Sequence, residues 1–417
     1  MKVCAIGLGR LGLPWALVAG EAGHQVVGVD ADPSVVEAVN QRKVLTLEPG
    51  VAEMLGKPGC SLRATTSIAD GLVDSDVSVV MVPTAYQSDG SFDLGAVLDV
   101  VNVIGLHSEL TADPHLVLVV STVSPGSISG TVRGTLERVT GRRLASRIGL
   151  AYSPEFHAIG SIVRDIRQPD LLIVGADDAW TGELASNLCR SLVALPVAIR
   201  KMSSTEAELT KLLLNCYVTT KISFANFVGE LCEAYGANSW EVCDALGDDS
   251  RIGASYLRPG PPFGGPCFPS DNPALSASAR AVGIEPYLPE AVLAVNERRY
   301  RQLHQELRRA GDGATVGVVG LEFKAGTGVI EGSPALELAR RCLAEGRRVI
   351  IYDPLVMEKA RTLGGVDVAS SVAEVVVSSD VVLLANDDPT LSALVAEANR
   401  ATTSPAIVIE PWSRHEP

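Results

Sequence analysis

The first residues that could do chemistry stand in a glycine-rich turn near the start of the chain. Gly7-x-Gly9-x-x-Gly12 follows an apolar segment, residues 2–6, and precedes a predicted helix. The first Gly permits a tight turn, the second lets the backbone approach a pyrophosphate, and the third allows close helix–strand packing. A second apolar segment ends at Asp30, whose carboxylate would accept hydrogen bonds from a ribose and repel a 2′-phosphate. The turn predicts an NAD site; the alternative is an α/β turn without a ligand.

A thiol is the second candidate. The chain has eight cysteines, and none falls in a Cys-x-x-Cys pair or at metal-like spacing from a His, so we predict no metal site. Seven of them are expected to be small buried hydrophobic residues. Cys267 stands instead in a loop rich in Gly and Pro, Gly264-Gly-Pro-Cys267-Phe-Pro-Ser-Asp271. A flexible loop that exposes a thiol to a substrate is what a nucleophile requires.

Two polar residues share one face of a long predicted helix. Apolar residues recur at helical spacing over 204–236 with almost no helix breakers. Lys211 and Asn215 are four residues apart there, so both side chains point the same way. They could offer a cation and an amide donor to one oxygen, although a solvated Lys and a surface Asn are the ordinary alternative.

Three further polar residues stand at positions where catalytic groups are often found. Thr122 and Glu155 each follow the end of a predicted strand, where catalytic groups collect in open α/β sheets. Asp271 lies four residues after Cys267, from where it could orient a water or tune nearby charge. Taken alone, each of the three is as compatible with an ordinary loop cap as with catalysis.

The elements that must position these residues alternate between strands and helices in two stretches. The first stretch has predicted strands at 2–6, 25–29, 77–82, 116–120, 148–152 and 171–174. The second has predicted strands at 316–319, 348–352, 380–385 and 406–409. The part between is helical, apart from a Gly/Pro cluster at 258–269. We therefore expect an α/β protein with two Rossmann-like doubly wound parallel-sheet domains joined by a helical domain with a long central helix. The expected domains are 1–200, 201–308 and 309–417.

Composition narrows the class of partner. The chain has 417 residues and a formal net charge of −14, so its surface would repel a phosphate backbone and a nucleic-acid partner is not expected. The first residues lead directly into a strand rather than a signal peptide, and no uncharged apolar run reaches membrane-spanning length. We expect a cytoplasmic protein with reduced thiols and no membrane partner.

Segments along nearly the whole chain resemble the UDP-glucose/GDP-mannose dehydrogenase family, with the UDP-glucose branch closest in motif. The opening turn and the cysteine loop are both similar to that family's motifs. The other similar segments are Leu47-Glu-Pro-Gly50, Val82-Pro-Thr84, Asp89-Gly-Ser91, Ser121-Thr122-Val123, Ser153-Pro-Glu155-Phe156, Glu208-Leu-Thr-Lys211-x-x-x-Asn215, Lys221-Ile-Ser-Phe224, Arg251-Ile-Gly253, Tyr256-Leu-x-Pro-Gly260, Gly320-Leu-x-Phe-Lys324 and Ser333-Pro334.

The resemblance implies two successive NAD-dependent oxidations of a nucleotide sugar at C6, from alcohol to aldehyde to acid. Cys267 would trap the aldehyde as a thiohemiacetal, which loses a second hydride to give a thioester that water hydrolyses. Lys211 and Asn215 would stabilise the oxyanion, and Glu155 would activate the water. The implied catalytic residues are Cys267, Lys211, Asn215, Asp271, Glu155 and Thr122.

The resemblance also implies two binding sets and a homodimer built on the central helix. Arg251 would reach the sugar site of the neighbouring subunit. The implied NAD-binding residues are Gly7, Gly9, Arg10, Leu11, Gly12, Asp30, Pro83, Thr84, Ser121 and Thr122. The implied nucleotide-sugar-binding residues are Glu155, Phe156, Lys211, Asn215, Arg251, Tyr256, Phe263, Gly264 and Lys324.

The chain departs from the family pattern at several places, among them the closing segment at residues 410–414. Ile159 stands where the family usually has a second acidic residue, and Ser270 stands where it usually has Lys. Pro262 replaces a Gly before Phe263. The segment 328–332, Gly-Val-Ile-Glu-Gly, lacks an Arg expected to contact the cofactor pyrophosphate. Since the six catalytic positions are kept, we expect an active enzyme with an altered substrate pocket, and either weaker NAD binding or another residue in the role of the Arg.

UDP-glucose, oxidised to UDP-glucuronate, is the substrate that these motifs favour. Three alternatives stay open: a dehydrogenase of a UDP-N-acetylhexosamine or an unusual nucleotide sugar, a non-catalytic nucleotide-sugar-binding homologue, and a two-electron hydroxyacid dehydrogenase. The last class needs no thiol, so substitution of Cys267 separates it from the first prediction.

Overall fold

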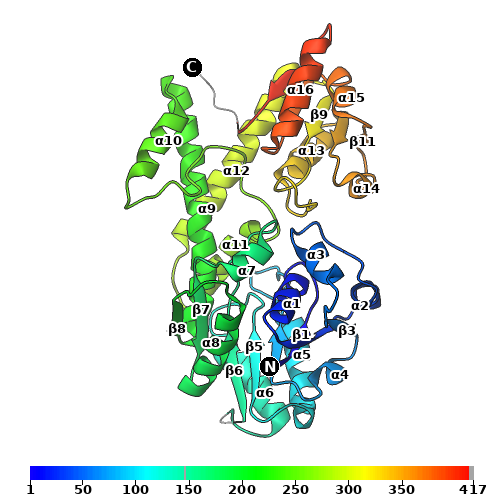
Figure 1. The fold of residues 1–417 in the computed structure, drawn as a ribbon. Helices are drawn as coiled ribbons and strands as arrows, with labels where there is room; N and C mark the ends of the chain where they lie inside the picture. Colours follow the sequence, from blue (N-terminus) through cyan, green and yellow to red (C-terminus); the bar gives the residue numbers. More distant parts are fainter. Residues whose placement is uncertain (145–146, 413–417) are drawn as a thin grey trace. The chain divides into compact units, whose positions relative to one another are not determined.

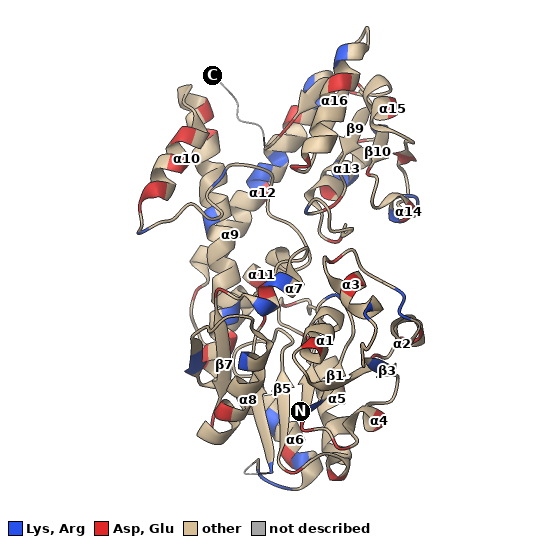
Figure 2. Cartoon of the chain, in the orientation of Figure 1, with Lys and Arg blue, Asp and Glu red and all other residues tan. Residues whose placement is uncertain are grey.

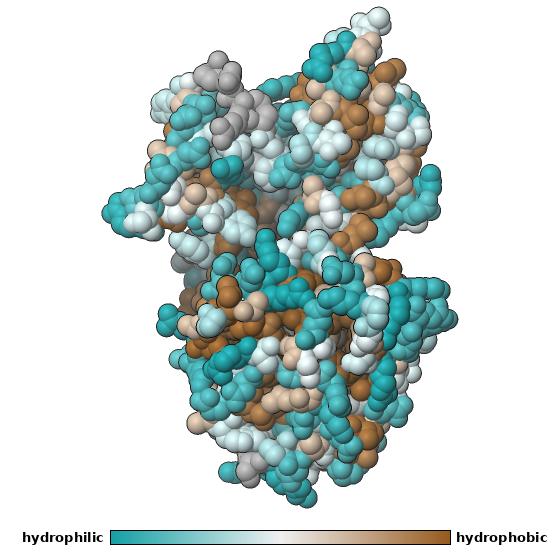
Figure 3. Space-filling view, in the orientation of Figure 1, coloured by the Kyte–Doolittle hydropathy of each residue, from teal (hydrophilic) through white to brown (hydrophobic). Residues whose placement is uncertain are grey.

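A computed structural model of the chain describes residues 1–144 and 147–412, which form two compact units divided after Leu213. Figure 1 shows the elements of both. In Figure 3 the visible surface of each unit is mainly hydrophilic, with smaller hydrophobic areas between, which is ordinary for a folded protein. Within the described residues, no helix is both long enough and apolar enough to cross a membrane.

The first unit is built on an eight-stranded sheet with the order β3-β2-β1-β4-β5-β6-β7-β8. Its pairs are parallel except β6 with β7, which run antiparallel. The strands are β1 (Lys2–Ile6), β2 (Gln25–Val29), β3 (Arg63–Thr65), β4 (Val77–Val80), β5 (His115–Val119), β6 (Ile148–Tyr152), β7 (Leu172–Ala176) and β8 (Ile199–Met202).

Helices cover both faces of this sheet because successive strand residues point to opposite sides. On one face, Val3, Val79 and Leu118 pack with α1 (Gly12–Glu21), α3 (Val51–Gly56), α7 (Ile162–Arg167) and α8 (Ala179–Leu192). On the other face, Cys4 and Val119 pack with α4 (Ile68–Leu72), α5 (Gly95–Leu106) and α6 (Arg133–Thr140). Asp32 caps α2 (Pro33–Asn40), and Asp178 caps α8 by accepting from the amide of Thr181.

The second unit contains a parallel five-stranded sheet with the order β11-β10-β9-β12-β13. Its strands are β9 (Val316–Val319), β10 (Val349–Tyr352), β11 (Asp367–Val368), β12 (Val381–Leu384) and β13 (Ile407–Ile409). The helices α12 (Tyr287–Leu307) and α13 (Pro334–Ala344) pack on one face of the sheet, and α15 (Val372–Val377) and α16 (Pro389–Ala401) pack on the other. A short helix, α14 (Met357–Ala360), follows β10.

The remaining helices carry or support candidate residues. α9 (Ser204–Tyr235) is a single helix of 32 residues that begins in the first unit. α10 (Ser239–Asp248) packs against α9 through a small cluster that includes Val228 and Cys243. α11 (Phe268–Ala281) begins directly after Cys267.

The predicted fold class is confirmed: two Rossmann-like sheets with a helical region between them in sequence. Three short strands, β3, β8 and β11, were not predicted, because each is short and carries charged or polar residues. The antiparallel pairing of β6 with β7 is a detail that the sequence does not give, since the hydrophobic pattern of a buried strand does not encode its direction. The predicted Gly/Pro cluster at 258–269 ends earlier than expected, as α11 starts at Phe268.

Candidate functional site

The turn after β1 has the shape that a dinucleotide requires. Gly7 has a φ of +94°, and a Cβ on Gly12 would lie 1.7 Å from the carbonyl oxygen of Gly7. A Cβ on Gly9, in contrast, would meet nothing within 4 Å, so the backbone there is open to a ligand. No side chain caps the N-terminus of α1, whose first amides are therefore available to an anion.

The Asp30 carboxylate is held in place by backbone amides, one of them in the glycine-rich turn after β1. Its Oδ2 accepts a hydrogen bond of 2.8 Å from the amide of Leu8, and its Oδ1 accepts one of 3.0 Å from the amide of Asp32. The side chain is half-buried at the end of β2. A carboxylate in this place selects a free ribose hydroxyl over a 2′-phosphate, which fits NAD.

The loops after β4 and β5 are tied to each other. The Thr84 hydroxyl donates to the carbonyl of Thr122 at 2.8 Å, and the Ser121 hydroxyl donates to the carbonyl of Val82 at 2.6 Å. Because β2, β1, β4 and β5 are neighbours in the sheet, their carboxyl ends bring the predicted NAD-binding residues of the first unit to one edge. Arg10, Pro83 and Gly9 are exposed there.

The next strand along contributes a carboxylate. β5 and β6 pair with Val119 opposite Tyr152, so Thr122 and Glu155 each lie three residues beyond the same register position. The Glu155 side chain is 16% exposed, and its Oε2 lies 2.8 Å from Nε2 of His157, whose side chain is 6% exposed. Sequence reasoning did not single out His157, since a lone His carries no motif.

Lys211 of α9 reaches the same loop. Its Nζ donates a hydrogen bond to the carbonyl of Glu155 and lies 5.1 Å from the centre of the Phe156 ring. The first unit therefore brings together Glu155, Phe156 and Lys211, three of the residues predicted to bind the nucleotide sugar.

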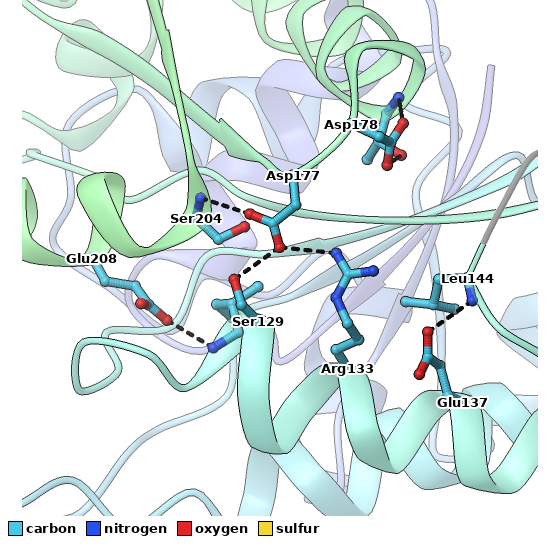
Figure 4. Close-up of polar contacts among 10 residues, drawn as sticks. Ser129, Arg133, Glu137, Leu144, Asp177, Asp178, Ser204 and Glu208 are labelled. Carbon is cyan, nitrogen blue, oxygen red and sulfur yellow. Dashed lines mark hydrogen bonds and ion pairs between the residues drawn. The ribbon is translucent and has the colours of Figure 1, made fainter.

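The start of α9 is anchored by two acids, which Figure 4 shows. Glu208 is fully buried and accepts hydrogen bonds from the amides of Gly126 and Ile128 at 2.6 and 2.7 Å. Burial raises the pKa of Glu208 to about 7, and the two amides oppose that rise. The two hydrogen bonds to Glu208 fix the segment after Thr122 to the helix that carries Lys211. Glu208 was not among the predicted site residues, although it stands three residues before Lys211 in the motif Glu208-Leu-Thr-Lys211.

Asp177 is the second anchor. It accepts from the Ser129 hydroxyl at 2.8 Å and the Arg133 guanidinium at 2.9 Å, and from the amide of Ser204 at 3.2 Å (Figure 4). Burial acts to raise the pKa of Asp177, but these hydrogen bonds outweigh it and hold that pKa below its ordinary value. The N-terminus of α9 is thus held by a carboxylate outside the helix.

The second unit contains the cysteine loop. Cys267 is exposed and occupies the position directly before the first turn of α11, where free backbone amides favour negative charge. Asp271 is 3% exposed and accepts a hydrogen bond of 2.6 Å from the side-chain amide of Asn215. Two of the predicted catalytic residues, Asn215 and Asp271, are therefore in direct contact, which was not predicted.

The other cysteines differ from Cys267 in burial. Six are buried, and Cys60 is intermediate. Burial raises the pKa of Cys4 and of Cys216 to about 12, and that of Cys189, Cys243 and Cys342 to about 11. A thiol that stays protonated is a poor nucleophile, so these five are suited to structural roles.

Close packing explains the glycines before Cys267. Gly265 has a φ of +85° and donates its amide to the carbonyl of Gly332 at 2.9 Å. A Cβ on Gly265 would lie 2.6 Å from the Phe323 ring, and a Cβ on Gly264 would lie 2.4 Å from the carbonyl of Gly332. The cysteine loop is therefore packed on the turn that follows β9.

Two asparagines that sequence reasoning missed hold the same loop from helices. Asn296 of α12 accepts from the amide of Phe263 at 2.8 Å and donates to its carbonyl at 3.2 Å. Asn226 of α9 accepts from the amide of Gly260 and donates to the carbonyl of Pro261. Pro262 lies between these positions, and none of the four hydrogen bonds requires an amide N–H at residue 262.

Comparison with known sequences decides the family. Three models of the UDP-glucose/GDP-mannose dehydrogenase family match this chain: the NAD binding domain at residues 1–193, the central domain at 205–298 and the UDP binding domain at 317–414.

The chain belongs to the UDP-glucose/GDP-mannose dehydrogenase family.

Individual relatives agree with this. A UDP-glucose 6-dehydrogenase of Haloferax volcanii is 36% identical over 94% of this chain and 93% of its own. A GDP-mannose 6-dehydrogenase of Pseudomonas aeruginosa is 33% identical over 93% of this chain and 92% of its own. Among solved structures, a UDP-glucose dehydrogenase from Pyrobaculum islandicum superposes with a TM-score of 0.91, at 32% identity over 99% of this chain and 94% of that one.

Membership confirms the predictions of NAD as cofactor and of an oxidoreductase of the nucleotide-sugar 6-dehydrogenase class. The four remaining predicted substrate residues of this dehydrogenase lie in the second unit. Arg251 is exposed and paired with Asp249, Tyr256 is exposed with a φ of +61°, Phe263 is buried, and Lys324 is exposed. No group of His, Cys, Asp and Glu in the described part of the chain has the geometry of a metal site.

Proposed function

We propose that this dehydrogenase oxidises the C6 alcohol of a nucleotide sugar to a carboxylate in two steps, with Cys267 as the nucleophile and UDP-glucose as the substrate. The observation that carries the proposal is the contrast among the thiols. Cys267 is exposed at the N-terminus of α11, whereas six of the other seven cysteines are buried. A covalent intermediate requires a thiol that substrate can reach.

The chain's own residues would act as follows. The Cys267 thiolate forms a bond to the aldehyde carbon, and Lys211 and Asn215 stabilise the oxygen as it becomes negative. NAD, held by the turn at Gly7–Gly12 and by Asp30, supplies the electron acceptor, and one molecule is reduced in each oxidation. Asp271 orients the Asn215 amide through their hydrogen bond of 2.6 Å.

Hydrolysis completes the reaction. Water adds to the thioester carbon, the carbon–sulfur bond breaks, and Cys267 leaves as a thiolate. Glu155 removes the proton from the attacking water, and Thr122 positions that water. The equal offset of Thr122 and Glu155 from the paired ends of β5 and β6 supports their joint role.

UDP-glucose is proposed because a relative named for this substrate is 36% identical to the chain over 94% of its length. The third matching model is described as a UDP binding domain, and there Lys324 is proposed to bind the nucleotide. Tyr256, Phe263 and Gly264 are proposed to line the sugar pocket, and Arg251 is proposed to reach the sugar pocket of the neighbouring subunit. Ile159 and Ser270 favour a second candidate, a UDP-N-acetylhexosamine, because that branch of the family also lacks both charged residues at these positions.

A homodimer built on α9 is also proposed. Tyr217, Phe224 and Leu231 recur every seventh residue and are exposed, together with Phe227 and Tyr235. Most of α9 is tan in Figure 2, the colour of residues other than Lys, Arg, Asp and Glu. A face of this kind is costly to leave in water, and a second copy of the helix would cover it. Sedimentation velocity of the purified protein, with Phe224→Glu as a disrupting variant, tests the dimer.

The decisive experiment measures NADH and acid with a panel of UDP-glucose, UDP-N-acetylhexosamines and GDP-mannose. The proposal expects two NADH for each UDP-glucose consumed. Cys267→Ala should form no acid, and Cys267→Ser tests whether the sulfur itself is required. Full turnover by Cys267→Ala would support a two-electron dehydrogenase instead. Binding of a nucleotide sugar without NADH from any of the panel would support a non-catalytic homologue.

A further inference from the structure

The loop between β6 and α7 holds two ionisable side chains against each other at low exposure. Oε2 of Glu155 and Nε2 of His157 are 2.8 Å apart, and their side chains are 16% and 6% exposed. Nδ1 of His157 is buried and has no hydrogen-bond partner among the described residues. A buried side chain that uses one nitrogen and leaves the other unsatisfied needs a reason beyond packing.

The unsatisfied nitrogen indicates which proton His157 carries. A proton on Nδ1 would be a buried donor without an acceptor, which costs more than an unused lone pair in the same place. The neutral tautomer with the proton on Nε2 avoids that cost and lets Nε2–H donate to the Glu155 carboxylate. His157 would thus occupy Oε2 and leave Oε1 of Glu155 for another partner.

The loop around this pair is fixed at several points. Glu48, 6% exposed, accepts from the amides of Gly160 and Ile162 at 2.7 and 2.6 Å. Asp165 of α7 accepts from the amide of Ala158 at 3.1 Å. A loop held in this way keeps a side-chain contact in one geometry, as a reacting group requires.

The charged and titratable groups near the pair come from three helices. Lys211 of α9 donates to the Glu155 carbonyl, and Asp165 belongs to α7. Cys189 of α8 is close enough for the charge of Glu155 to add to burial in raising the Cys189 pKa to about 11. Ile159, four residues after Glu155, cannot ionise, so His157 is the nearer candidate to assist Glu155.

We propose that His157 is a positioning residue for hydrolysis: its neutral Nε2–H holds Oε2 of Glu155 and thereby aims Oε1 at the water that releases the acid. This rests on the proposed function. In that step the proton of the water passes to Oε1, the new carbon–oxygen bond forms, and the carbon–sulfur bond to Cys267 breaks, so no redox partner is needed.

Three substitutions of similar size separate this role from packing. His157→Gln keeps an amide N–H near the position of Nε2, His157→Asn places its amide near Nδ1, and His157→Leu has neither. With UDP-glucose and NAD, we expect His157→Leu and His157→Asn to lose roughly 10- to 100-fold in kcat, with KM falling alongside it because only the hydrolysis of the adduct is slowed. His157→Gln should keep a kcat within about fivefold of the parent.

Intact-mass measurement during turnover identifies the affected step. A covalent adduct on Cys267 should accumulate in His157→Leu and His157→Asn, but not in the parent or in His157→Gln. Equal kcat in the Asn and Gln variants, or no adduct in either weak variant, would overturn the role of His157. Failure of the parent enzyme to make NADH would instead remove the proposed function itself. If His157→Leu does not fold, the Asn and Gln pair still decides between the outcomes.

Discussion

The chain contains a strand–turn–helix–strand–aspartate frame twice, and the two copies use their backbone amides differently. After β1, Asp30 accepts from the amide of Leu8 at 2.8 Å. After β9, Asp353 accepts from the amide of Leu321 at 2.7 Å. Each aspartate directly follows the neighbouring strand, β2 or β10. The frame itself is therefore the same in both units.

The difference lies in what fills the turn. The first turn is short and open at Gly9, where an added Cβ would meet nothing within 4 Å. The second turn is long, and the buried carboxylate of Glu322 accepts from the amides of Gly326, at 3.0 Å, and Gly328. The protein thus supplies its own anion in the second turn and leaves the first to a ligand's phosphates.

Gly12→Ala should have the largest effect, because the new Cβ would lie 1.7 Å from the carbonyl of Gly7. The turn must open to admit it. We expect loss of NAD binding by about 1,000-fold or more and destabilisation of the first unit by about 4 kcal/mol. NAD titration and denaturant unfolding measure the two effects. Gly20→Ala, in open space on the same helix, is the matched control and should stabilise by about 0.5–1 kcal/mol.

Glu208→Gln tests a buried carboxylate of the first unit, and Glu322→Gln below tests one of the second unit. Since folding raises the pKa of Glu208 from 4.5 to about 7, its ionisation weakens the fold as pH rises through that window. The parent should lose up to about 3 kcal/mol of stability relative to Glu208→Gln between pH 4.5 and pH 7. Unfolding of both proteins across that range tests the sign; a constant difference would contradict it.

Glu322→Gln should disturb the second turn alone. An amide group in place of one carboxylate oxygen would face a backbone N–H, so we expect a loss of about 2 kcal/mol of stability and faster hydrogen exchange near Gly326 and Gly328. NAD affinity should be unchanged, because the first turn keeps its open geometry. A fall in NAD affinity of tenfold would show that the two turns are not independent.

Asp30→Ala should have the smallest effect on the free-energy scale. Loss of the carboxylate removes the ribose contact and the repulsion of a 2′-phosphate, so we expect roughly tenfold weaker use of NAD and a smaller gap between NAD and NADP. Steady-state rates with both cofactors measure the change. Asp353→Ala, its counterpart in the second unit, should leave the cofactor preference as it is.

Much of the fold could be predicted because buried parallel strands are continuous apolar runs separated by amphipathic helices. β1, β2, β6 and β9 begin and end at the predicted residues. Edge strands escaped prediction, as β3 and β8 contain Arg63 and Arg200–Lys201 in place of an apolar run. The direction of β7 depends on tertiary pairing, which no local pattern records.

The candidate site was predictable only where a motif carries it. The glycine turn and Cys267 stand in recognisable local patterns. Three residues that hold the site accept hydrogen bonds from backbone amides far away in the sequence: Asn226, Asn296 and Glu208. The sequence around each of them therefore does not indicate its partner. His157 is two residues from Glu155, but the contact between them depends on the path of the loop. The predicted domain bounds and site roles remain predictions.

The uneven burial of the cysteines has a practical consequence for anyone who handles the protein. An alkylating reagent added in small amounts should modify Cys267 first, then the half-buried Cys60, and leave the six interior sulfurs intact until the chain unfolds. The molar amount of iodoacetamide that stops turnover would then equal the amount of active enzyme in a preparation. Immobilisation through a maleimide would inactivate the enzyme, because the maleimide would react with Cys267 first.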